Sequence, residues 1–275
     1  MQKFLTDVHT HSTFSHDGVD ELKDMLAEAQ RKGVAFYGVS EHFDHFLSKK
    51  ENEWGIPVID VEEYFHSARH LQEDYEGVMN VLIGVEFSYI EDAEATENYC
   101  AIVKKYRPDF IVNSVHGLGE KLYYYKTPFY QEGKLGNRED AYKAYLSCIL
   151  KSLDAPYPYD IVGHLGYAAR YAPYEDKSLC YEEFPQEFDA IFNEIIRKGK
   201  ILEVNSATQE GLCVPDLKTL ERYFALGGRK ISFASDAHQT QRICDKRAEI
   251  VEKLKEIGFT HITVPCKGEY IDLEL

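Results

Sequence analysis

Histidines and carboxylates occur in this sequence at spacings that suit metal binding. The motif His9-Thr10-His11 lies near the start of the chain, and Asp236-Ala237-His238 repeats the same spacing near its end. Each motif follows a short apolar run of the kind that forms a β-strand. Because side chains on a strand alternate between its two faces, residues two apart point the same way. His9 and His11 can therefore share one ion, and Asp236 and His238 repeat the same geometry.

Further polar side chains follow other strand-like runs. If these runs are parallel strands of a barrel, their carboxyl ends meet at one mouth, where such barrels hold their active sites. Burying several polar groups there without compensation is costly, so the joint pattern favours a metal centre. Mixed His, Asp and Glu ligands suit zinc, iron or manganese. The residues that follow the runs are His9 and His11, Glu41 and His42, Glu86, His116, His164, and Asp236 and His238.

The turn Ser15-His16-Asp17-Gly18 offers one more ligand. Either His16 or Asp17 can face inward, and we favour Asp17. The alternative is that Asp17-Gly18 only forms a turn, with the aspartate near the start of the following helix.

Other polar residues near these motifs are given different roles. Glu41 is predicted to orient His42 rather than to bind an ion itself. Four histidines do not follow a strand-like run and are predicted to lie on the surface. They are His45, His66, His70 and His261.

The short apolar runs alternate with segments of helical periodicity, which is typical of βα units around a parallel sheet. A possible eighth run, Ile262–Pro265, leaves seven or eight units open. We therefore expect an α/β fold, a TIM-like (β/α) barrel. The seven clear runs are Phe4–Val8, Ala35–Val39, Val81–Val85, Phe110–Val115, Tyr159–Gly163, Ile201–Asn205 and Ile231–Ala234.

Helices are expected between the runs. In Val19–Gln30, apolar residues recur on one face and Gly33 follows as a stop. Because no repeat or linker divides the sequence, we expect a single domain over residues 1–275. The tyrosine-rich segment Gly117–Asp140 is predicted to be a long loop over one face, either a lid or a structural excursion. The other helical segments are Tyr142–Leu150, Phe188–Lys198 and Arg247–Ile257.

Charge and composition restrict the partners. The chain has 31 Lys and Arg against 47 Asp and Glu, a formal net charge of -16. Such a surface repels extended nucleic acid. A small phosphorylated substrate remains compatible, because bound divalent cations dominate the field inside a site.

Membrane insertion and export are not expected. No stretch is apolar enough over the length of a membrane span. The six cysteines are scattered without CxxC spacing, which predicts reduced thiols and a cytoplasmic location.

Taken together, His9-Thr10-His11, Glu41-His42, Glu86, His116, His164 and Asp236-Ala237-His238 resemble the motifs of the PHP superfamily, named for polymerase and histidinol phosphatase. The resemblance runs from the first strand to the last. Chain length and the motif Asn113-Ser114-Val115-His116 are similar to those of its histidinol-phosphate phosphatases. The resemblance implies a distorted (β/α)7 barrel with up to three divalent ions (Zn, Fe or Mn).

The resemblance also implies how the ligands are shared. One ion would take His9, His11, Glu86 and Asp236, and Glu86 would bridge to a second ion held by His116 and His164. The third would take His42, His238 and Asp17, or His16 in its place. Such cations lower the pKa of a nucleophilic water and neutralise phosphoryl charge, so a phosphatase needs no covalent intermediate.

Asp236, His238 and Arg170 are the catalytic candidates. Arg170, six residues after His164, is placed to contact phosphate with a planar fork, and the alternative is an exposed surface arginine. The resemblance leads us to expect a second arginine after the sixth strand, where this chain has none. Arg242 is a possible substitute, or it pairs with an acidic residue on the surface. The leaving group would receive its proton from His238 or from a metal-bound water.

The resemblance favours hydrolysis of histidinol phosphate. Loss of the expected arginine supports an alternative, a PHP phosphoesterase acting on another small ester or on a nucleotide. A second alternative is a metal-binding module without turnover.

Overall fold

Seven parallel strands form the centre of the molecule, in the computed structural model that describes residues 5–45, 58–119, 121–131, 134–209 and 211–275. The strands follow one another around the sheet in chain order, and every pair of neighbours is parallel. In order they are β1 (Leu5–Asp7), β2 (Val34–Phe43), β3 (Asn80–Ser88), β4 (Phe110–Ser114), β9 (Ile161–Val162), β10 (Ile201–Asn205) and β11 (Ile231–Ala234).

The last strand returns to the first. The Val8 amide donates to the carbonyl of Phe233, and Thr10 pairs with Ala237 in an isolated parallel bridge. This seam nearly closes the sheet into a seven-stranded barrel and confirms the predicted α/β barrel fold. All seven predicted runs contain a strand, although Phe4 lies outside the described residues.

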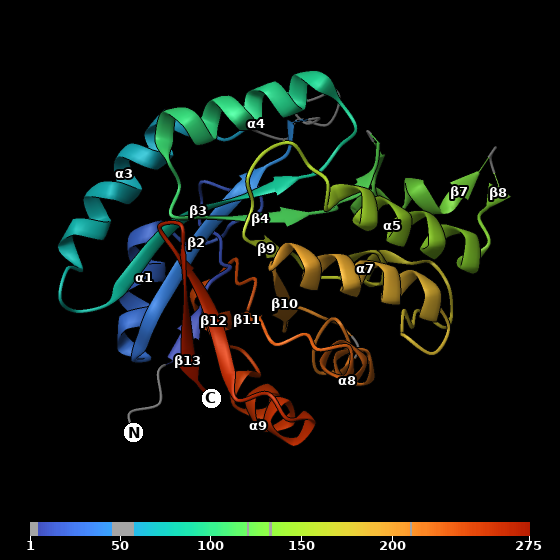
Figure 1. The fold of residues 1–275 in the computed structure, drawn as a ribbon. Helices are drawn as coiled ribbons and strands as arrows, with labels where there is room; N and C mark the ends of the chain where they lie inside the picture. Colours follow the sequence, from blue (N-terminus) through green and yellow to red (C-terminus); the bar gives the residue numbers. More distant parts are fainter. Residues whose placement is uncertain (1–4, 46–57, 120, 132–133, 210) are drawn as a thin grey trace.

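Helices surround the barrel, with α1, α3 and α4 along one side of the strands and α5, α7 and α8 along another (Figure 1). In α1 the predicted stripe Leu22, Met25, Leu26 and Ala29 is buried against the sheet. Because helices cover its outer face, β3 is buried along nearly its whole length. The helices are α1 (Leu22–Arg31), α3 (Val61–Asp74), α4 (Ala93–Tyr106), α5 (Arg138–Ser152), α6 (Tyr167–Tyr171), α7 (Pro185–Lys198), α8 (Leu217–Ala225) and α9 (Arg247–Ile257).

Glycines bring neighbouring segments of the barrel close together. A Cβ atom on Gly84 of β3 would lie 2.4 Å from the ring of Phe110, and one on Gly38 of β2 would lie 2.8 Å from the Cα of Val8. These two positions therefore leave room that larger residues need inside the barrel.

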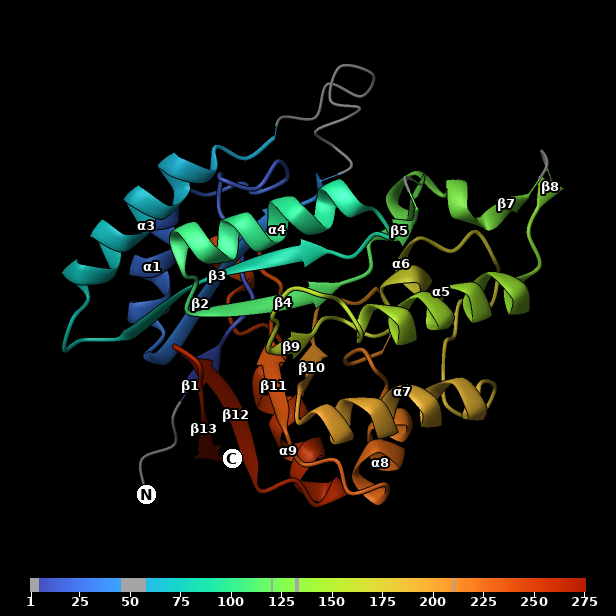
Figure 2. The same ribbon diagram turned by 45° about the horizontal axis from the view of Figure 1, so that its top comes forward.

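The predicted eighth run is not an eighth barrel unit. Ile262–Pro265 lies in β12 (His261–Cys266), which pairs antiparallel with β13 (Glu269–Glu274). The Lys267 amide donates to the carbonyl of Asp109, and the Tyr270 hydroxyl contacts Asp160. Both partners precede a barrel strand, so this hairpin covers the amino-terminal end of the barrel (Figure 2).

The segment after β4 is an irregular excursion at the opposite, carboxyl end of the strands. It contains two small hairpins and two short 3-10 helices, and the second hairpin lies beside the end of α5 (Figure 2). No helix in the described part of the chain is both long and apolar enough to cross a membrane. The small elements are β5 (Gly117–Leu118), β6 (Lys121–Leu122), η1 (Tyr123–Tyr125), η2 (Thr127–Phe129), β7 (Tyr130–Gln131), β8 (Lys134–Leu135) and, later, η3 (Thr240–Arg242).

Candidate metal centre

The carboxylate of Glu86 lies at the centre of a cluster of histidines at the carboxyl end of the barrel. Strand register sets its position, because Glu86 on β3 is the direct neighbour of His42 on β2. Its Oε1 atom is 2.8 Å from His164 Nε2, 3.1 Å from His116 Nε2 and 3.4 Å from His9 Nε2. Its Oε2 atom is 2.8 Å from His42 Nδ1 and 3.6 Å from His11 Nε2. One fully buried carboxylate thus contacts five imidazoles.

Three pairs of imidazole nitrogens face one another around this carboxylate. The Nε2–Nε2 distances are 3.1 Å for His9 and His11, 3.3 Å for His116 and His164, and 3.4 Å for His42 and His238. A tetrahedral ion with Zn–N bonds of about 2.0–2.1 Å holds neighbouring ligand atoms about 3.3–3.4 Å apart. The three pairs therefore have the spacing that three ions require.

The hydrogen bonds of the Nδ1 atoms show which ring nitrogen of each histidine carries the proton. The Nδ1 atom of His9 is 2.6 Å from Glu203 Oε1, that of His116 is 3.0 Å from Asp44 Oδ1, and that of His238 is 3.0 Å from the carbonyl of Asp236. These oxygens only accept, so each Nδ1 is a donor and each neutral ring turns an Nε2 lone pair inward. Lone pairs that face one another need a cation between them, and these residues therefore fit divalent ions.

Glu203 and Asp44 are functional residues that the sequence analysis missed. Glu203 on β10 is fully buried, and its second oxygen accepts from the backbone amide of His164 at 2.7 Å. It therefore fixes two of the histidines. Two signals in the sequence could have identified these residues. Glu203 interrupts the apolar residues Ile201, Leu202 and Val204, and Asp44 is two residues after His42.

The two aspartates lie where two of the histidine pairs meet. Asp236 Oδ1 is 3.3 Å from His11 Nε2 and 3.7 Å from His238 Nδ1. Its backbone is in the left-handed region (φ 51°), which turns its side chain into the mouth directly after β11. Asp17 Oδ1 is 3.3 Å from His238 Nε2 and 3.6 Å from His42 Nε2. His16 lies nearby, with its ring centroid 5.5 Å from that of His42, and both residues are exposed at the rim of the cluster.

Two predictions about neighbouring residues were wrong. Glu41 does not orient His42 directly, because it accepts from the backbone and hydroxyl of Ser12 and from the hydroxyl of Ser15. The Ser15 hydroxyl lies 3.1 Å from His11 Nδ1, so Glu41 acts on His11 through the loop. His45 is buried, with its Nδ1 3.0 Å from Asn98, whereas His66, His70 and His261 are exposed as predicted.

Electrostatics in the metal-free protein follow from this crowding. Burial lowers the pKa of His9, but Glu203 and Glu86 outweigh it and raise the pKa well above its usual value. Burial likewise opposes protonation of His42, yet Asp17 and Glu86 raise its pKa to about 9. The positive charges in turn outweigh burial and hold the pKa of Glu86 well below its ordinary range. Protons therefore occupy this site when ions do not.

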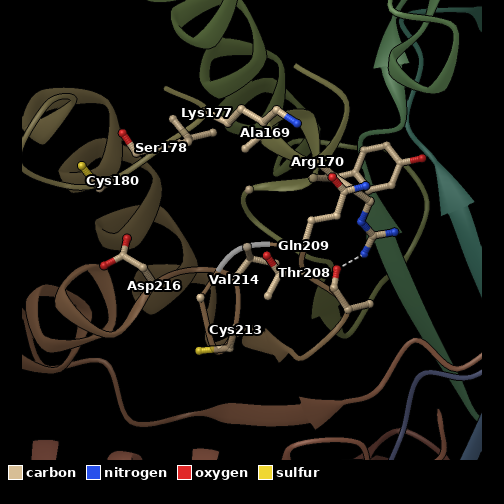
Figure 3. Close-up of a pocket in the computed structure, with 15 residues that line it drawn as sticks. Ala169, Arg170, Lys177, Ser178, Cys180, Thr208, Gln209, Cys213, Val214 and Asp216 are labelled. Atoms are coloured by element: carbon tan, nitrogen blue, oxygen red, sulfur yellow. Dashed lines mark hydrogen bonds between the residues drawn. The ribbon is translucent and has the colours of Figure 1, made fainter. Parts of the chain in front are cut away.

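Arg170 on α6 reaches the edge of the cluster. Its side chain is only 19% exposed, so the alternative of an exposed surface arginine is wrong. The guanidinium donates to the carbonyl of Ala207 and lies 3.5 Å from Asp236 Oδ2. Arg170 also lines a cavity of about 240 Å³, together with Lys177 and Asp216 (Figure 3). Arg242, the suggested substitute for a second phosphate-binding arginine, instead pairs with Asp245 at 2.9 Å.

Sequence comparisons identify proteins similar to this one. A family model described as PHP domain matches residues 7–207. A histidinol-phosphatase from Lactococcus lactis subsp. lactis is 29% identical over 274 residues, which cover 97% of this chain and 96% of that protein. A probable histidinol-phosphatase from Clostridium acetobutylicum is 26% identical over 86% of this chain and 88% of its own length.

Solved structures agree with these sequence matches. The Lactococcus lactis histidinol phosphate phosphatase, crystallised with zinc, L-histidinol and phosphate, has a TM-score of 0.85 and 25% identity, covering 98% of this chain and all of that one. A Listeria monocytogenes structure described as a histidinol phosphatase has a TM-score of 0.74 at 22% identity. That match covers 89% of this chain and 99% of the other and supports the fold alone.

Proposed function

Because this chain belongs to the PHP domain family, we propose that it is a metal-dependent phosphatase that hydrolyses L-histidinol phosphate to L-histidinol and phosphate in histidine biosynthesis. The observation that carries this proposal is the set of three facing imidazole pairs around Glu86. The substrate is assigned by similarity to relatives that span nearly the whole chain. The enzyme is a single domain over residues 1–275 and acts in the cytoplasm.

The proposed ligand sets follow the contacts in the cluster. Divalent ions (Zn, Fe or Mn) bound there would neutralise phosphoryl charge and lower the pKa of the attacking water. We assign His9, His11 and Asp236 to one ion, His116 and His164 to a second with Glu86 between them, and Asp17, His42 and His238 to a third.

The chain's own residues complete the reaction. Arg170 has five N–H donors, of which the contacts to Ala207 and Asp236 use only one nitrogen, so its remaining donors can bind phosphoryl oxygens in a planar fork. His238 lies at the rim, 23% exposed, beside the position of the departing alcohol. As a ligand of the third ion it would carry no proton on Nε2, so the alkoxide would take its proton from water. Asp236 contacts both residues: its carboxylate lies 3.5 Å from the Arg170 guanidinium, and its backbone carbonyl accepts from His238 Nδ1 at 3.0 Å.

The test is a comparison of phosphate esters with defined metals. The purified protein is stripped of metal, reloaded with zinc, manganese or iron, and assayed on L-histidinol phosphate and a panel of sugar, amino-alcohol and nucleoside monophosphates. We expect metal-dependent phosphate release with a kcat/KM for L-histidinol phosphate at least about tenfold above any other ester. Faster turnover of a different ester would instead support the broader phosphoesterase, and stoichiometric metal without hydrolysis would support a non-catalytic module.

A further inference from the structure

Three histidines that hold none of the proposed ions line one cleft on the surface of the protein. The cleft has a volume of about 900 Å³, and His16, His66 and His70 all belong to its lining. One side of the cleft is the turn that leads into α1, and the other side is α3. The cleft therefore collects imidazoles from two separate segments of the chain.

His66 and His70 are four residues apart on α3. Residues at this spacing are neighbours on a helix surface, with Cβ atoms about 5–6 Å apart. The opposite side of α3 is buried through Tyr64, Phe65 and Ala68, whereas both histidines are exposed. Within the described part of the chain, neither imidazole has a hydrogen-bond or ion-pair partner. Two histidines at this spacing can bind one zinc ion, as they do in the helical His-Glu-x-x-His motif.

Carboxylates extend the same face of α3 in both directions. Glu63 lies one turn before the first histidine, Asp74 lies one turn after the second, and both line the cleft. Neither carboxylate forms an ion pair with another described residue. Lys23 is the only lysine or arginine in the described lining, and its Nζ atom is 2.7 Å from Glu21. A divalent cation therefore meets histidine and carboxylate ligands here, which suit zinc.

The cleft borders the candidate metal centre. His16 lines this cleft and also the smaller cavity over the metal centre, and its ring centroid is 5.5 Å from that of His42. Ser15 also lines the cleft, and its hydroxyl is 3.1 Å from His11 Nδ1. An ion that leaves α3 can thus reach the metal centre along polar side chains.

We propose that His66 and His70 bind one transition-metal ion, such as zinc, apart from the ions of the metal centre. We call these two histidines the α3 site. A carboxylate, Glu63 or Asp74, supplies a third ligand, and water completes the coordination shell. Because the α3 site is exposed and has few protein ligands, it holds its ion more weakly and exchanges it faster than the buried centre. The cleft then delivers the ion past His16 to the metal centre. The α3 site does not depend on the substrate proposed above.

The first test counts zinc ions. Protein loaded with three zinc ions per chain is titrated with more zinc by calorimetry, and the imidazole signals of His66 and His70 are followed by NMR. We expect one further ion per chain that shifts both signals. His66→Ala and His70→Ala should each weaken its binding at least about tenfold, equivalent to about 1.4 kcal/mol. The control His261→Ala removes an exposed histidine of β12 outside the cleft and should keep the binding.

A rearranged variant tests the spacing itself. His66→Ala combined with Asp74→His removes one histidine of the pair and places a new one four residues after His70. Helix geometry should then restore the further ion. A wild type that binds no further ion, or alanine variants that bind it as tightly as the wild type, would overturn the α3 site.

The second test measures delivery. Zinc is transferred from a chromophoric chelator to metal-free protein and followed by stopped-flow absorbance. Transfer should be several-fold slower in the double variant His66→Ala/His70→Ala than in the wild type, while the final zinc content of the metal centre stays the same. Equal transfer rates would overturn the delivery role. Phosphatase activity enters neither test, so failure of the proposed function is distinguishable from failure of the α3 site.

Discussion

Replacing Glu203 with glutamine is expected to weaken metal binding, although Glu203 itself is not a proposed ligand. In the wild type, one Glu203 oxygen lies 2.6 Å from His9 Nδ1, and the other accepts from the His164 amide at 2.7 Å and from Asn205 at 3.0 Å. Glutamine has one oxygen for these two sides. The oxygen should face the two donors of His164 and Asn205, which leaves its NH2 group facing His9.

The consequence is a change of tautomer. An NH2 group opposite Nδ1 requires a lone pair on that nitrogen, so the His9 proton moves to Nε2, the atom that faces His11. A protonated Nε2 cannot bind a metal. Loss of such an orienting partner typically lowers metal affinity about 10- to 100-fold, or about 1.4–2.7 kcal/mol.

The assay is a competition for zinc against a chromophoric chelator, with the His9 tautomer read from nitrogen chemical shifts. Asp109→Asn is the matched control, because Asp109 is also a buried carboxylate that accepts from a backbone amide, that of Ile83 at 2.8 Å, but it lies at the other end of the barrel. We expect it to lower the free energy of unfolding and to leave zinc affinity unchanged. Zinc affinity and activity of Glu203→Gln within twofold of wild type would refute the orienting role.

Three further predictions concern protons, phosphate and packing. Zinc binding at pH 7 should release protons, and the affinity for zinc should rise with pH up to about pH 9. The reason is that Asp17 and Glu86 outweigh burial and raise the pKa of His42 to about 9, whereas only a neutral imidazole binds a metal. Calorimetry in buffers of different ionisation enthalpy measures the proton release, and a zinc affinity that does not change with pH would contradict this prediction. Arg170→Ala should raise the inhibition constant of inorganic phosphate about 10- to 100-fold, since a hydrogen bond to a charged group contributes roughly 1.5–3 kcal/mol. Arg170→Lys should raise it less. Equal inhibition constants in the wild type and both variants would argue against contact between Arg170 and phosphate. Gly84→Ala should lower the free energy of unfolding by about 1–3 kcal/mol, because the added Cβ would lie 2.4 Å from the Phe110 ring. Thermal melts should show that Phe110→Leu partly restores the stability of Gly84→Ala. An unchanged melting temperature in Gly84→Ala would count against the clash.

The barrel and the histidine cluster were predictable because the carboxyl ends of parallel barrel strands converge. Every predicted run contains a strand, and parallel strands bring residues that are far apart in sequence to one end. His9 and His11 do lie side by side, with their Nε2 atoms 3.1 Å apart, although both follow the end of β1 at Asp7 and do not belong to the strand. Strand β2 is longer than its predicted run, which ends at Val39, and it continues to Phe43. His42 therefore lies inside this strand, and strand pairing sets it beside Glu86.

The remaining features depend on partners that sequence alone does not reveal. Glu203 and Asp44 matter because of the histidines that they contact across the barrel, and local pattern does not identify such contacts. Ile262–Pro265 has the composition of a barrel strand. Only the turn that follows it distinguishes an eighth barrel strand from the antiparallel hairpin that forms. Lys267 and Gly268 both have positive φ (53° and 87°), the conformation of a two-residue hairpin turn, so the chain reverses there.

The seam between the first and last barrel strands has a consequence for biosynthesis. His9 and His11 leave the ribosome more than 200 residues before Asp236, whose Oδ1 lies 3.3 Å from His11 Nε2. The ion proposed for these three residues can therefore enter only after Asp236 has emerged, and once bound it would link the first and last barrel strands as a cross-link does. In a cell that is short of metal, this seam would be held by its backbone hydrogen bonds and packing alone, and the protein would be less stable.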